Sequence, residues 1–487
     1  MGFFGRREII DDLCALWGKR TSSLVTCRGR RRIGKSTLIE RFAEISGARF
    51  IKIEGIRPTP KMSNADQLKN FCTQLAVQTQ AERTPAEDWL NCFIRLDREI
   101  AMHSGRTVVL LDEVSWMAFD DCTFSGTLKV AWDNYFKKHS KLILVVCGSV
   151  STWIKREIID DGAFFGRRSL DVVVPELPLA ECVKFWGRAA ARIDPREIID
   201  VLSVTGGVPR YLEEIDPGLT ANENIRRLCF RPKSPLRVDF DEMYADVITQ
   251  LPTLTAQTLR VLAEGPKTVT EISAQLKLAK SGHLSEALMQ LEECGLVSPD
   301  VGKNPATGKD ARAKFYRLKD NYTRFYLRYI EPAKETIDAG SYSIGTLDAL
   351  DGWESVLGLA FENLVVNNVR ALLAPLHLTT SPVLSAAPYR RQGGSAGKGV
   401  QVDLLLQTRR ALVLVEVKRK KEVGRDVIED IRRKVKCLKR PNETSLRLAL
   451  VYEGALAKSV EAEGYFDALS PSESYWESDA TSQTMTG

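Results

Sequence analysis

A glycine-rich loop near the N-terminus constrains the fold of this chain more than any other feature. The run Gly29–Ser36 reads G-R-R-R-I-G-K-S and fits the phosphate-binding pattern G-x-x-x-x-G-K-[ST]. It follows a short apolar run, residues 24–27, and precedes a segment of helical spacing, residues 36–42. In this context the backbone N–H groups of the loop and the N-terminus of the helix face phosphate oxygens. The sequence therefore predicts a P-loop nucleotide-binding domain.

Apolar runs farther along the chain predict the sheet of this domain. Residues 108–111 and 142–146 are continuously apolar, as in strands that are buried on both faces of a parallel sheet. Longer helical stretches separate these runs, which is typical of an α/β doubly wound layer. At 487 residues the chain is too long for a single core, so several domains are expected.

The residues of the loop have distinct expected roles. Lys35 would reach the β- and γ-phosphates of ATP, and the Ser36 hydroxyl would coordinate Mg²⁺. The other loop positions expected to contact the nucleotide are Gly29, Arg30, Arg31, Arg32, Ile33, Gly34 and Thr37.

The ends of two later strands complete the expected ATP site. Asp112 and Glu113 directly follow the apolar run 108–111. Asp112 would hold Mg²⁺ through water, and Glu113 would polarise the attacking water. Ser149 follows the run 142–146 and could sense the γ-phosphate, although a turn-forming serine explains this position nearly as well.

A second group of charged residues lies near the C-terminus. Glu416 and Lys418 stand two residues apart in an apolar run, so both face the same side of a strand. Asp403 lies in the preceding apolar run, and a hairpin through residues 407–411 would bring it beside Glu416. Two such carboxylates can bind Mg²⁺ or Mn²⁺ and polarise a water against a phosphodiester, while Lys418 orients that water. The alternative is an edge strand with a solvated Glu–Lys pair.

The charge distribution favours nucleic acid as a partner of this second group. The whole chain has a net charge of only +6, but residues 390–440 contain 16 Lys and Arg against 6 Asp and Glu. A basic surface attracts a polyanion, although such a stretch is also typical of a solvated face.

Composition argues against several other classes of protein. The ten cysteines occur singly, without a C-x-x-C motif, and only four histidines are present, so neither a zinc site nor a disulfide framework is expected. The sequence has no signal-peptide core and no apolar run of the roughly 18 residues that a spanning helix needs. We therefore expect a cytoplasmic protein without a membrane partner.

The middle of the chain, residues 253–332, predicts a winged helix-turn-helix. Apolar residues at helical spacing are followed by two short strands that flank a basic loop. The basic residues of that loop are Lys303, Lys309, Arg312 and Lys314. The expected recognition helix, residues 281–294, carries three glutamates and little positive charge beyond His283, which weakens the case for reading the major groove. Contact with DNA through the hairpin and contact with a protein partner are both open.

Six motifs within about residues 1–230 resemble the archaeal-type ATPase family, which are P-loop NTPases of the AAA+/STAND group. They are F-F-G-R at 3–6, the arginine-rich loop, D-E at 112–113, C-G-S at 147–149, F-G-R-R at 165–168 and T-G-G-V-P-R-Y-L at 205–212. The resemblance implies that Arg6 lies near the nucleotide and that the last motif belongs to a lid subdomain. It also implies that Arg167 is an arginine sensor or finger, which would act between subunits of a homo-oligomer formed on ATP binding; a plain surface charge is the alternative.

The C-terminal region resembles the restriction-endonuclease-like PD-(D/E)xK fold, as found in domains that follow archaeal-type ATPase domains. The matching segments are L-A-F-E-N-L at 359–364, Q-V-D at 401–403 and V-E-V-K at 415–418. The resemblance implies that Glu362, on a helix, completes the acidic cluster with Asp403 and Glu416. No proline precedes Asp403, which departs from the family pattern.

Together these features predict an α/β multidomain protein. The expected domains are an AAA+-like P-loop domain with a parallel sheet and the start of a lid (1–215), the rest of the lid (216–252), a winged helix-turn-helix (253–332), a nuclease-like α/β domain (333–468) and a disordered tail (469–487). The function expected is that of an ATP-hydrolysing, Mg²⁺-dependent deoxyribonuclease with a role in genome maintenance, defence or mobile elements. The alternative is a regulatory NTPase whose C-terminal domain binds DNA or a protein without cleavage.

Overall fold

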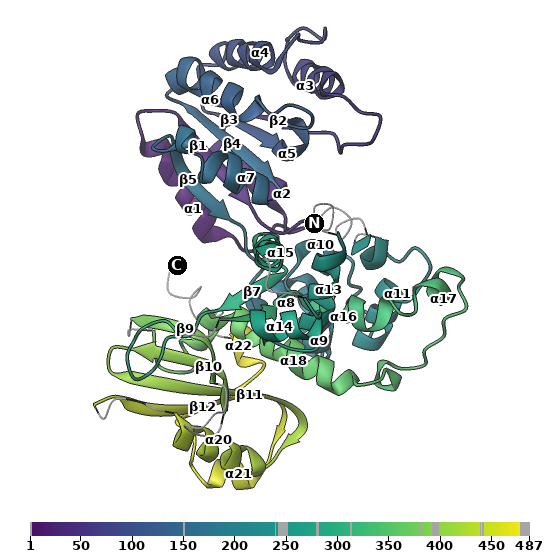
Figure 1. Ribbon diagram of the computed structural model, residues 1–487, viewed down its shortest axis with the longest axis vertical. Coiled ribbons are helices and arrows are strands. Elements are labelled where there is room, and N and C mark those ends of the chain that lie inside the picture. Colours follow the sequence, from purple (N-terminus) through teal and green to yellow (C-terminus); the bar gives the residue numbers. More distant parts are fainter. Residues whose placement is uncertain are drawn as a thin grey trace. The chain divides into compact units, whose positions relative to one another are not determined.

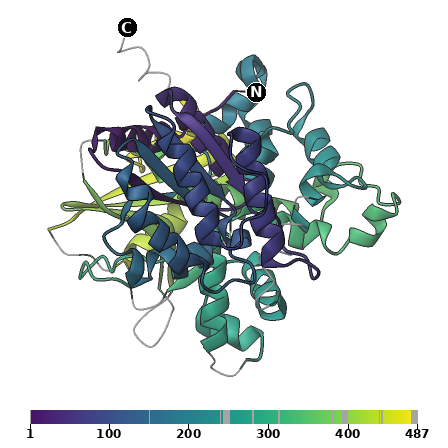
Figure 2. The same cartoon turned by 90° about the horizontal axis from the view of Figure 1, so that it is seen from above.

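The computed structural model describes residues 2–149, 151–238, 240–241, 252–278, 282–311, 314–379, 382–391, 399–438, 440 and 443–477 (Figures 1 and 2). The chain divides into two compact units, Met1–Glu176 (unit 1) and Leu177–Gly487 (unit 2). Within the described residues, no helix combines the length and the apolar character needed to cross a membrane.

Unit 1 is built on a parallel sheet of five strands in the order β2-β3-β4-β1-β5 (Figure 1). The strands are β1 (Ser23–Arg28), β2 (Arg49–Glu54), β3 (Thr107–Asp112), β4 (Leu142–Gly148) and β5 (Arg168–Val173). β3 and β4 are buried along their whole length, as their continuous apolar runs require. The prediction of a P-loop domain on a parallel sheet is confirmed. In this sheet β4 lies between β1, which precedes the phosphate loop, and β3, which ends in Asp112.

Helices cover both faces of this sheet. The helices are α1 (Arg7–Ala15), α2 (Lys35–Ser46), α3 (Asn64–Gln78), α4 (Trp89–Ala101), α5 (Val114–Met117), α6 (Phe124–Asn134) and α7 (Ser151–Ile154). Buried side chains of α3, α4 and α6, among them Phe71, Phe93 and Phe124, pack on one face in a large apolar core. On the other face α2 contacts β2 and β3 and is itself contacted by α1.

Unit 2 contains a mixed sheet of five strands in the order β13-β12-β11-β10-β9 (Figure 1). The strands are β9 (Val383–Arg391), β10 (Val400–Thr408), β11 (Ala411–Val423), β12 (Ser445–Leu456) and β13 (Ala468–Pro471). β9, β10 and β11 pair antiparallel, whereas β11, β12 and β13 pair parallel. α18 (Trp353–Asn367) packs on one face and α20 (Asp426–Cys437) on the other, each with its own apolar core.

The winged helix-turn-helix also lies in unit 2. Its helices are α13 (Pro252–Ala263), α14 (Val269–Gln275) and α15 (Gly282–Glu293), and its strands are β6 (Lys267–Thr268), β7 (Val297–Asp300) and β8 (Phe315–Leu318). β7 and β8 form the expected antiparallel hairpin, with a bridge between Lys303 and Asp310 inside its loop. Arg312, expected at the tip of this hairpin, lies outside the described residues.

The segment from Leu177 to Cys229 belongs to unit 2 and includes residues 205–212, the motif expected in the lid. Its helices are α8 (Leu179–Val183), α9 (Pro195–Thr205), α10 (Pro209–Leu212) and α11 (Ala221–Cys229). α9 contacts α18, and Leu179 and Leu202 share an apolar core with Phe361 and Leu364 of that helix. The first compact unit ends at Glu176, and the helices that follow it bury apolar side chains on the C-terminal region. The expected domain boundaries at residues 215 and 252 stay a prediction.

Short helices complete unit 2, and one of them corrects the expectation of a disordered tail from residue 469. These helices are α16 (Asn321–Phe325), α17 (Lys334–Asp338), α19 (Val369–Leu372), α21 (Lys458–Ala462) and α22 (Ser474–Glu477). Residues 468–471 form the edge strand β13, and Tyr475 of α22 is buried in the apolar core beneath α8. Strand pairing with β12 and the burial of Tyr475 thus hold residues 468–477 on unit 2. Residues 478–487 lie outside the described part of the chain.

Candidate functional sites

The phosphate loop connects β1 to α2, and its two glycines are required by its backbone. Gly29 has φ 150°, and a Cβ there would stand 2.7 Å from the carbonyl oxygen of Val174. Gly34 has φ 84° and precedes the first residue of α2. Both conformations favour glycine, so the spacing of the motif follows from this turn.

Lys35 lies folded into the loop. Its ammonium donates to the carbonyl oxygens of Gly29, at 3.1 Å, and Arg30, at 3.2 Å, and the side chain is buried. Arg6 donates from Nη2 to the carbonyl of Ile33 at 3.3 Å and so lies at the loop. Its expected position near the nucleotide stays a prediction. The loop arginines differ in environment: Arg30 is buried, whereas Arg31 lies over the ring of Trp116 at 5.8 Å.

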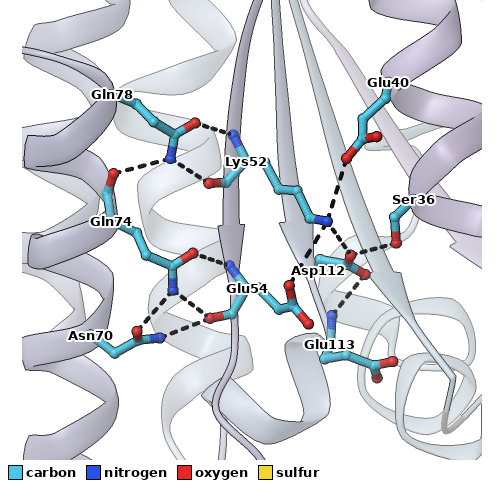
Figure 3. Close-up of polar contacts among 9 residues, drawn as sticks. All are labelled: Ser36, Glu40, Lys52, Glu54, Asn70, Gln74, Gln78, Asp112 and Glu113. Atoms are coloured by element: carbon cyan, nitrogen blue, oxygen red, sulfur yellow. Dashed lines mark hydrogen bonds and ion pairs between the residues drawn. The ribbon is translucent and has the colours of Figure 1, made fainter.

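The residues expected to hold Mg²⁺ meet directly. Ser36 at the start of α2 donates from Oγ to Asp112 Oδ2 at 2.5 Å, although the two residues are far apart in sequence (Figure 3). The other oxygen of Asp112 accepts the backbone N–H of Glu113 at 3.1 Å. One hydroxyl and one carboxylate at a helix N-terminus are a donor set that suits Mg²⁺ bound to phosphates.

Glu113 and Ser149 also meet, and this contact was not expected. Glu113 has φ 49°, which turns its side chain away from the line of β3. Its Oε2 accepts two hydrogen bonds from Ser149, one from the backbone N–H at 3.1 Å and one from Oγ at 2.9 Å. Ser149 therefore orients the candidate catalytic carboxylate.

Lys52 on β2 is a member of this site that the sequence did not indicate. Its ammonium lies 3.6 Å from Asp112 Oδ2, 3.4 Å from Glu40 and 3.8 Å from Glu54 (Figure 3). Burial alone would lower the pKa of Lys52, but the three carboxylates, led by Asp112, raise it above its usual value. The pKa of Glu54 is also raised, first by burial and then by Asp112. Lys52 thus supplies a fixed positive charge to the candidate Mg²⁺ ligand.

Side-chain amides of α3 hold β2 in this position. β2 is an edge strand, and its free backbone groups pair with Gln74 and Gln78 (Figure 3). Gln78 accepts from the N–H of Lys52 at 3.0 Å and donates to its carbonyl, and Gln74 does the same at Glu54. These pairs satisfy groups that would otherwise be open at a sheet edge, so Lys52 and Glu54 are fixed beside Asp112.

Arg167 is held within its own unit. It forms a two-pronged ion pair with Asp133 of α6, with Nε–Oδ1 at 2.8 Å and Nη2–Oδ2 at 3.0 Å. Lys129 contacts the same carboxylate at 3.1 Å. In this arrangement Arg167 does not reach the phosphate loop of its own chain through any described contact, so its proposed role in a neighbouring site stays a prediction.

In unit 2, Asp403 and Glu416 are opposite each other on adjacent strands. Leu404 pairs with Val415, so the hairpin has the expected register. The pairing of β10 with β9 is irregular between Val402 and Leu405, and such an irregularity can redirect the side chain of Asp403. Asp403 Oδ2 accepts the backbone N–H of Val417 at 3.0 Å. β11 is central and Glu416 is fully buried, so the alternative of a solvated pair on an edge strand is wrong.

Two lysines neutralise Glu416. Lys418 Nζ lies 2.6 Å from Oε1, as expected from their common strand face. Lys434 of α20 contacts both oxygens, at 2.6 and 2.7 Å. Lys434 was missed in the sequence because the contact depends on how α20 packs across β11.

A pocket of about 520 Å³ lies between α18, β10, β11 and α20. Asp403 and Glu362 are among its lining residues, whereas Glu416 is not. Its polar lining includes Asp403, Glu362, Lys418, Lys434 and Arg433. Burial raises the pKa of Asp403 to about 6, and the nearby Glu362 adds to this effect. Burial likewise raises the pKa of Glu362 and of Glu416. Burial therefore disfavours the charged form of all three carboxyl groups.

The expected three-carboxylate metal cluster is not formed. Within the described residues, no three His, Cys, Asp or Glu side chains are grouped so as to hold a metal ion. Glu362 lines the same pocket as Asp403 and contributes to the raised pKa of that carboxyl group. The facing pair of Asp403 and Glu416 still suits Mg²⁺, which often takes one or two carboxylates together with substrate phosphate.

A buried charge network lies on the other face of β11. Glu453 of β12, 2% exposed, pairs with Arg196 of α9 at 2.5 Å and with Arg419 at 3.2 Å. Arg419 also pairs with Asp200 of α9 at 2.6 Å and with Glu354 of α18 at 2.8 Å. This network joins α9 to β11, the strand that carries Glu416 and Lys418.

Comparison with known proteins agrees with parts of this description. A family model described as "Bacterial regulatory protein, arsR family" matches residues 257–298, from α13 to β7. An uncharacterized protein of Methanocaldococcus jannaschii is 23% identical over 430 residues, which cover 87% of this chain and 89% of that protein.

Two solved structures are similar to part of the chain. A Walker-type ATPase of Pyrococcus abyssi has 16% identity and a TM-score of 0.49, covering 67% of this chain and 96% of its own. The ORC2 protein of Aeropyrum pernix in ADPNP–ADP complexes has 14% identity and a TM-score of 0.46, covering 69% and 94%. The phosphate loop on its parallel sheet, and the helices and hairpin that include the matched residues 257–298, define a P-loop protein that carries a winged helix-turn-helix.

Proposed function

We propose that this protein binds and hydrolyses ATP at the phosphate loop of unit 1. The observation that carries the proposal is the direct contact of Ser36 with Asp112, beside Lys35 and Glu113. Residues from a loop, a helix N-terminus and a strand end converge there, which is the arrangement that phosphoryl transfer requires.

Each side chain has a defined task in hydrolysis. Lys35 exchanges its two loop carbonyls for the β- and γ-phosphate oxygens, to which its charge is better matched. Ser36 and Asp112 would hold Mg²⁺, which neutralises charge that develops on the phosphates. Glu113, oriented by Ser149, accepts a hydrogen bond from the attacking water.

Two variants test this proposal. Lys35→Ala is expected to weaken ATP binding, because the charge on the phosphates is lost, whereas Lys19→Ala at an exposed position serves as the matched control. Glu113→Gln is expected to bind ATP but to hydrolyse it at least about a hundredfold more slowly. Hydrolysis by Glu113→Gln at the parental rate would remove Glu113 from this role.

We further propose that the pocket of unit 2 is a divalent-metal-dependent nuclease site acting on DNA. The specific support is the facing pair of Asp403 and Glu416, fully or nearly buried, with Lys418 and Lys434 beside them. Charged groups are costly to bury in a central strand without a function or strong partners. The two carboxylates would hold Mg²⁺, which polarises a phosphodiester when bound. Lys418 orients the attacking water and stabilises negative charge on the phosphate.

DNA as the substrate is supported by charge and by the helix-turn-helix. Arg433 stands at the mouth of the pocket, in a stretch rich in Lys and Arg. The exposed face of α15 presents His283, Glu286, Met289 and Glu292, so base reading by this helix is not supported. We therefore assign DNA contact to the hairpin β7–β8, with Lys303 and Lys309 on its loop.

The rival proposal is a regulatory NTPase whose unit 2 binds DNA or a protein without cleavage. Incubation of the full chain with linear DNA in Mg²⁺ or Mn²⁺, with and without ATP, separates the two. Cleavage by the parent that is lost in Glu416→Ala, with ATP hydrolysis unchanged, supports the nuclease. DNA binding without cleavage under all these conditions, tested with single- and double-stranded DNA and with RNA, favours the rival.

A further inference from the structure

Glu416 has more positive charge around it than a structural ion pair needs. It is 0% exposed, and the ammonium groups of Lys418 and Lys434 both lie within hydrogen-bond distance of it. One lysine would neutralise one carboxylate. The second lysine approaches from a different element, α20, and touches both oxygens.

Lys434 is built into the pocket wall rather than left on the surface. Its side chain is 11% exposed, and Asp430, one helical turn earlier, contacts it at 3.2 Å. Asp430 in turn is bound by Arg433, so α20 holds the ammonium of Lys434 in a fixed place. Both oxygens of Glu416 are thereby engaged from the side of α20.

The charges around the pocket limit how many cations can enter. The carboxylates of Asp403, Glu416, Glu362 and Asp430 supply at most four negative charges, and the side chains of Lys418, Lys434, Arg419 and Arg433 supply four positive charges. Sites that hold two divalent ions usually place them about 4 Å apart, with a carboxylate that serves both ions. Lys434 contacts both oxygens of Glu416 and Lys418 contacts Oε1, which leaves no oxygen of Glu416 for a second ion.

We propose that Lys434 takes the place of a second metal ion at Glu416, so that the pocket binds a single divalent cation. This inference rests on the proposed nuclease site and specifies its metal content. Lys434 acts through Glu416 as a positioning residue: it fixes the carboxylate and supplies the positive charge that a second ion would otherwise bring. Lys418, on the same strand as Glu416, remains the lysine that faces the phosphate.

The test counts bound Mn²⁺ rather than measuring cleavage. Mn²⁺ is added to the nucleotide-free full chain, and the free ion is measured by electron paramagnetic resonance, so that the number of bound ions follows by difference. The same titration of Asp403→Ala counts the ions that bind outside the pocket. The variants are Lys434→Met, which removes the charge with little change of volume, and Lys434→Arg, which keeps it. Lys436→Met, exposed on the same helix, is the control for a general loss of charge.

The parent should bind one Mn²⁺ more than Asp403→Ala. Lys434→Met should bind two Mn²⁺ more than Asp403→Ala, or should bind its first pocket ion at least about tenfold more tightly than the parent does. The reason is that the ammonium of Lys434 repels a nearby divalent ion, and one unit charge at such a distance has at least this effect at protein dielectric constants. Lys434→Arg and Lys436→Met should match the parent.

Two pocket ions in the parent, or none, would overturn the inference, and neither result requires a variant to fold. A folded Lys434→Met with parental number and affinity would also overturn it. If one ion binds but no nucleic acid is cleaved, the metal assignment stands and the nuclease proposal fails.

Discussion

Asp403 should cost the protein stability at neutral pH, and removing its charge should restore that stability. Burial, together with Glu362, raises its pKa to about 6, and Lys434, Lys418 and the N–H of Val417 offset this only in part. An unfolded aspartate has a pKa near 3.9, so the difference corresponds to about 3 kcal/mol above pH 7. Between about pH 4 and pH 6 the folded state keeps a proton that the unfolded state has lost. This contribution therefore lowers stability as pH rises through that window.

The perturbation is Asp403→Asn in the presence of a chelator. In the parent, the backbone N–H of Val417 donates to the carboxylate of Asp403 at 3.0 Å. Asparagine keeps an oxygen that can accept this hydrogen bond but removes the charge. We expect the variant to exceed the parent by about 3 kcal/mol at pH 8 and to equal it at pH 4. Pulse proteolysis in urea, with peptides of β10 and β11 followed by mass spectrometry, isolates unit 2 from unit 1.

Asp430 provides a control of opposite sign on the same pocket wall. Burial would raise its pKa, but Lys434, then Lys418 and Arg433, hold it below its usual value. Asp430→Asn should therefore destabilise unit 2 at pH 8. Mg²⁺ should stabilise the parent but not Asp403→Asn, because the bound ion compensates the buried charge. An Asp403→Asn protein that is no more stable than the parent at pH 8 would refute the assignment of an uncompensated buried carboxylate.

Three further perturbations probe other charged contacts. Lys52→Met should lower the Mg²⁺ concentration that half-saturates ATP hydrolysis several-fold, because the ammonium no longer competes for Asp112; ATP binding without Mg²⁺, measured by fluorescence, should not change. Arg167→Ala should abolish any rise of specific ATPase activity with protein concentration, and light scattering that finds a monomer with and without a non-hydrolysable ATP analogue would count against its action in trans. Glu453→Ala should destabilise unit 2 by about 3 kcal/mol in urea unfolding, because two arginines lose a buried partner, although the partial exposure of Arg196 reduces the loss.

The parts of both sites that the sequence revealed are those governed by short-range rules. The phosphate loop is a fixed turn between a strand and a helix, so its spacing alone identifies Lys35 and Ser36. Strand period two placed Glu416 and Lys418 on one face, and the short hairpin placed Asp403 opposite Glu416. In each case the residues are related by local geometry that leaves little freedom.

The residues that were missed reach the sites through tertiary packing. Lys434 meets Glu416 because of the rotation of α20 about its axis, and Lys52 meets Asp112 because amides of α3 fix the edge strand β2. No pattern within a short window encodes either contact. The tail was misjudged for the same reason, since the burial of Tyr475 depends on a core assembled from α8 and α18.

β11 combines the functional and the structural charges of unit 2 on its two faces. Glu416 and Lys418 face α20 and the pocket, while the next residue, Arg419, points to the opposite side and pairs with Asp200 of α9. Because alternate residues of one strand cannot shift independently, a displacement of α9 that moved Arg419 would also move Lys418. α9 belongs to the segment that directly follows the P-loop unit in the chain. Arg419 itself also lines the pocket, so α9 is linked to the pocket through one ion pair with β11.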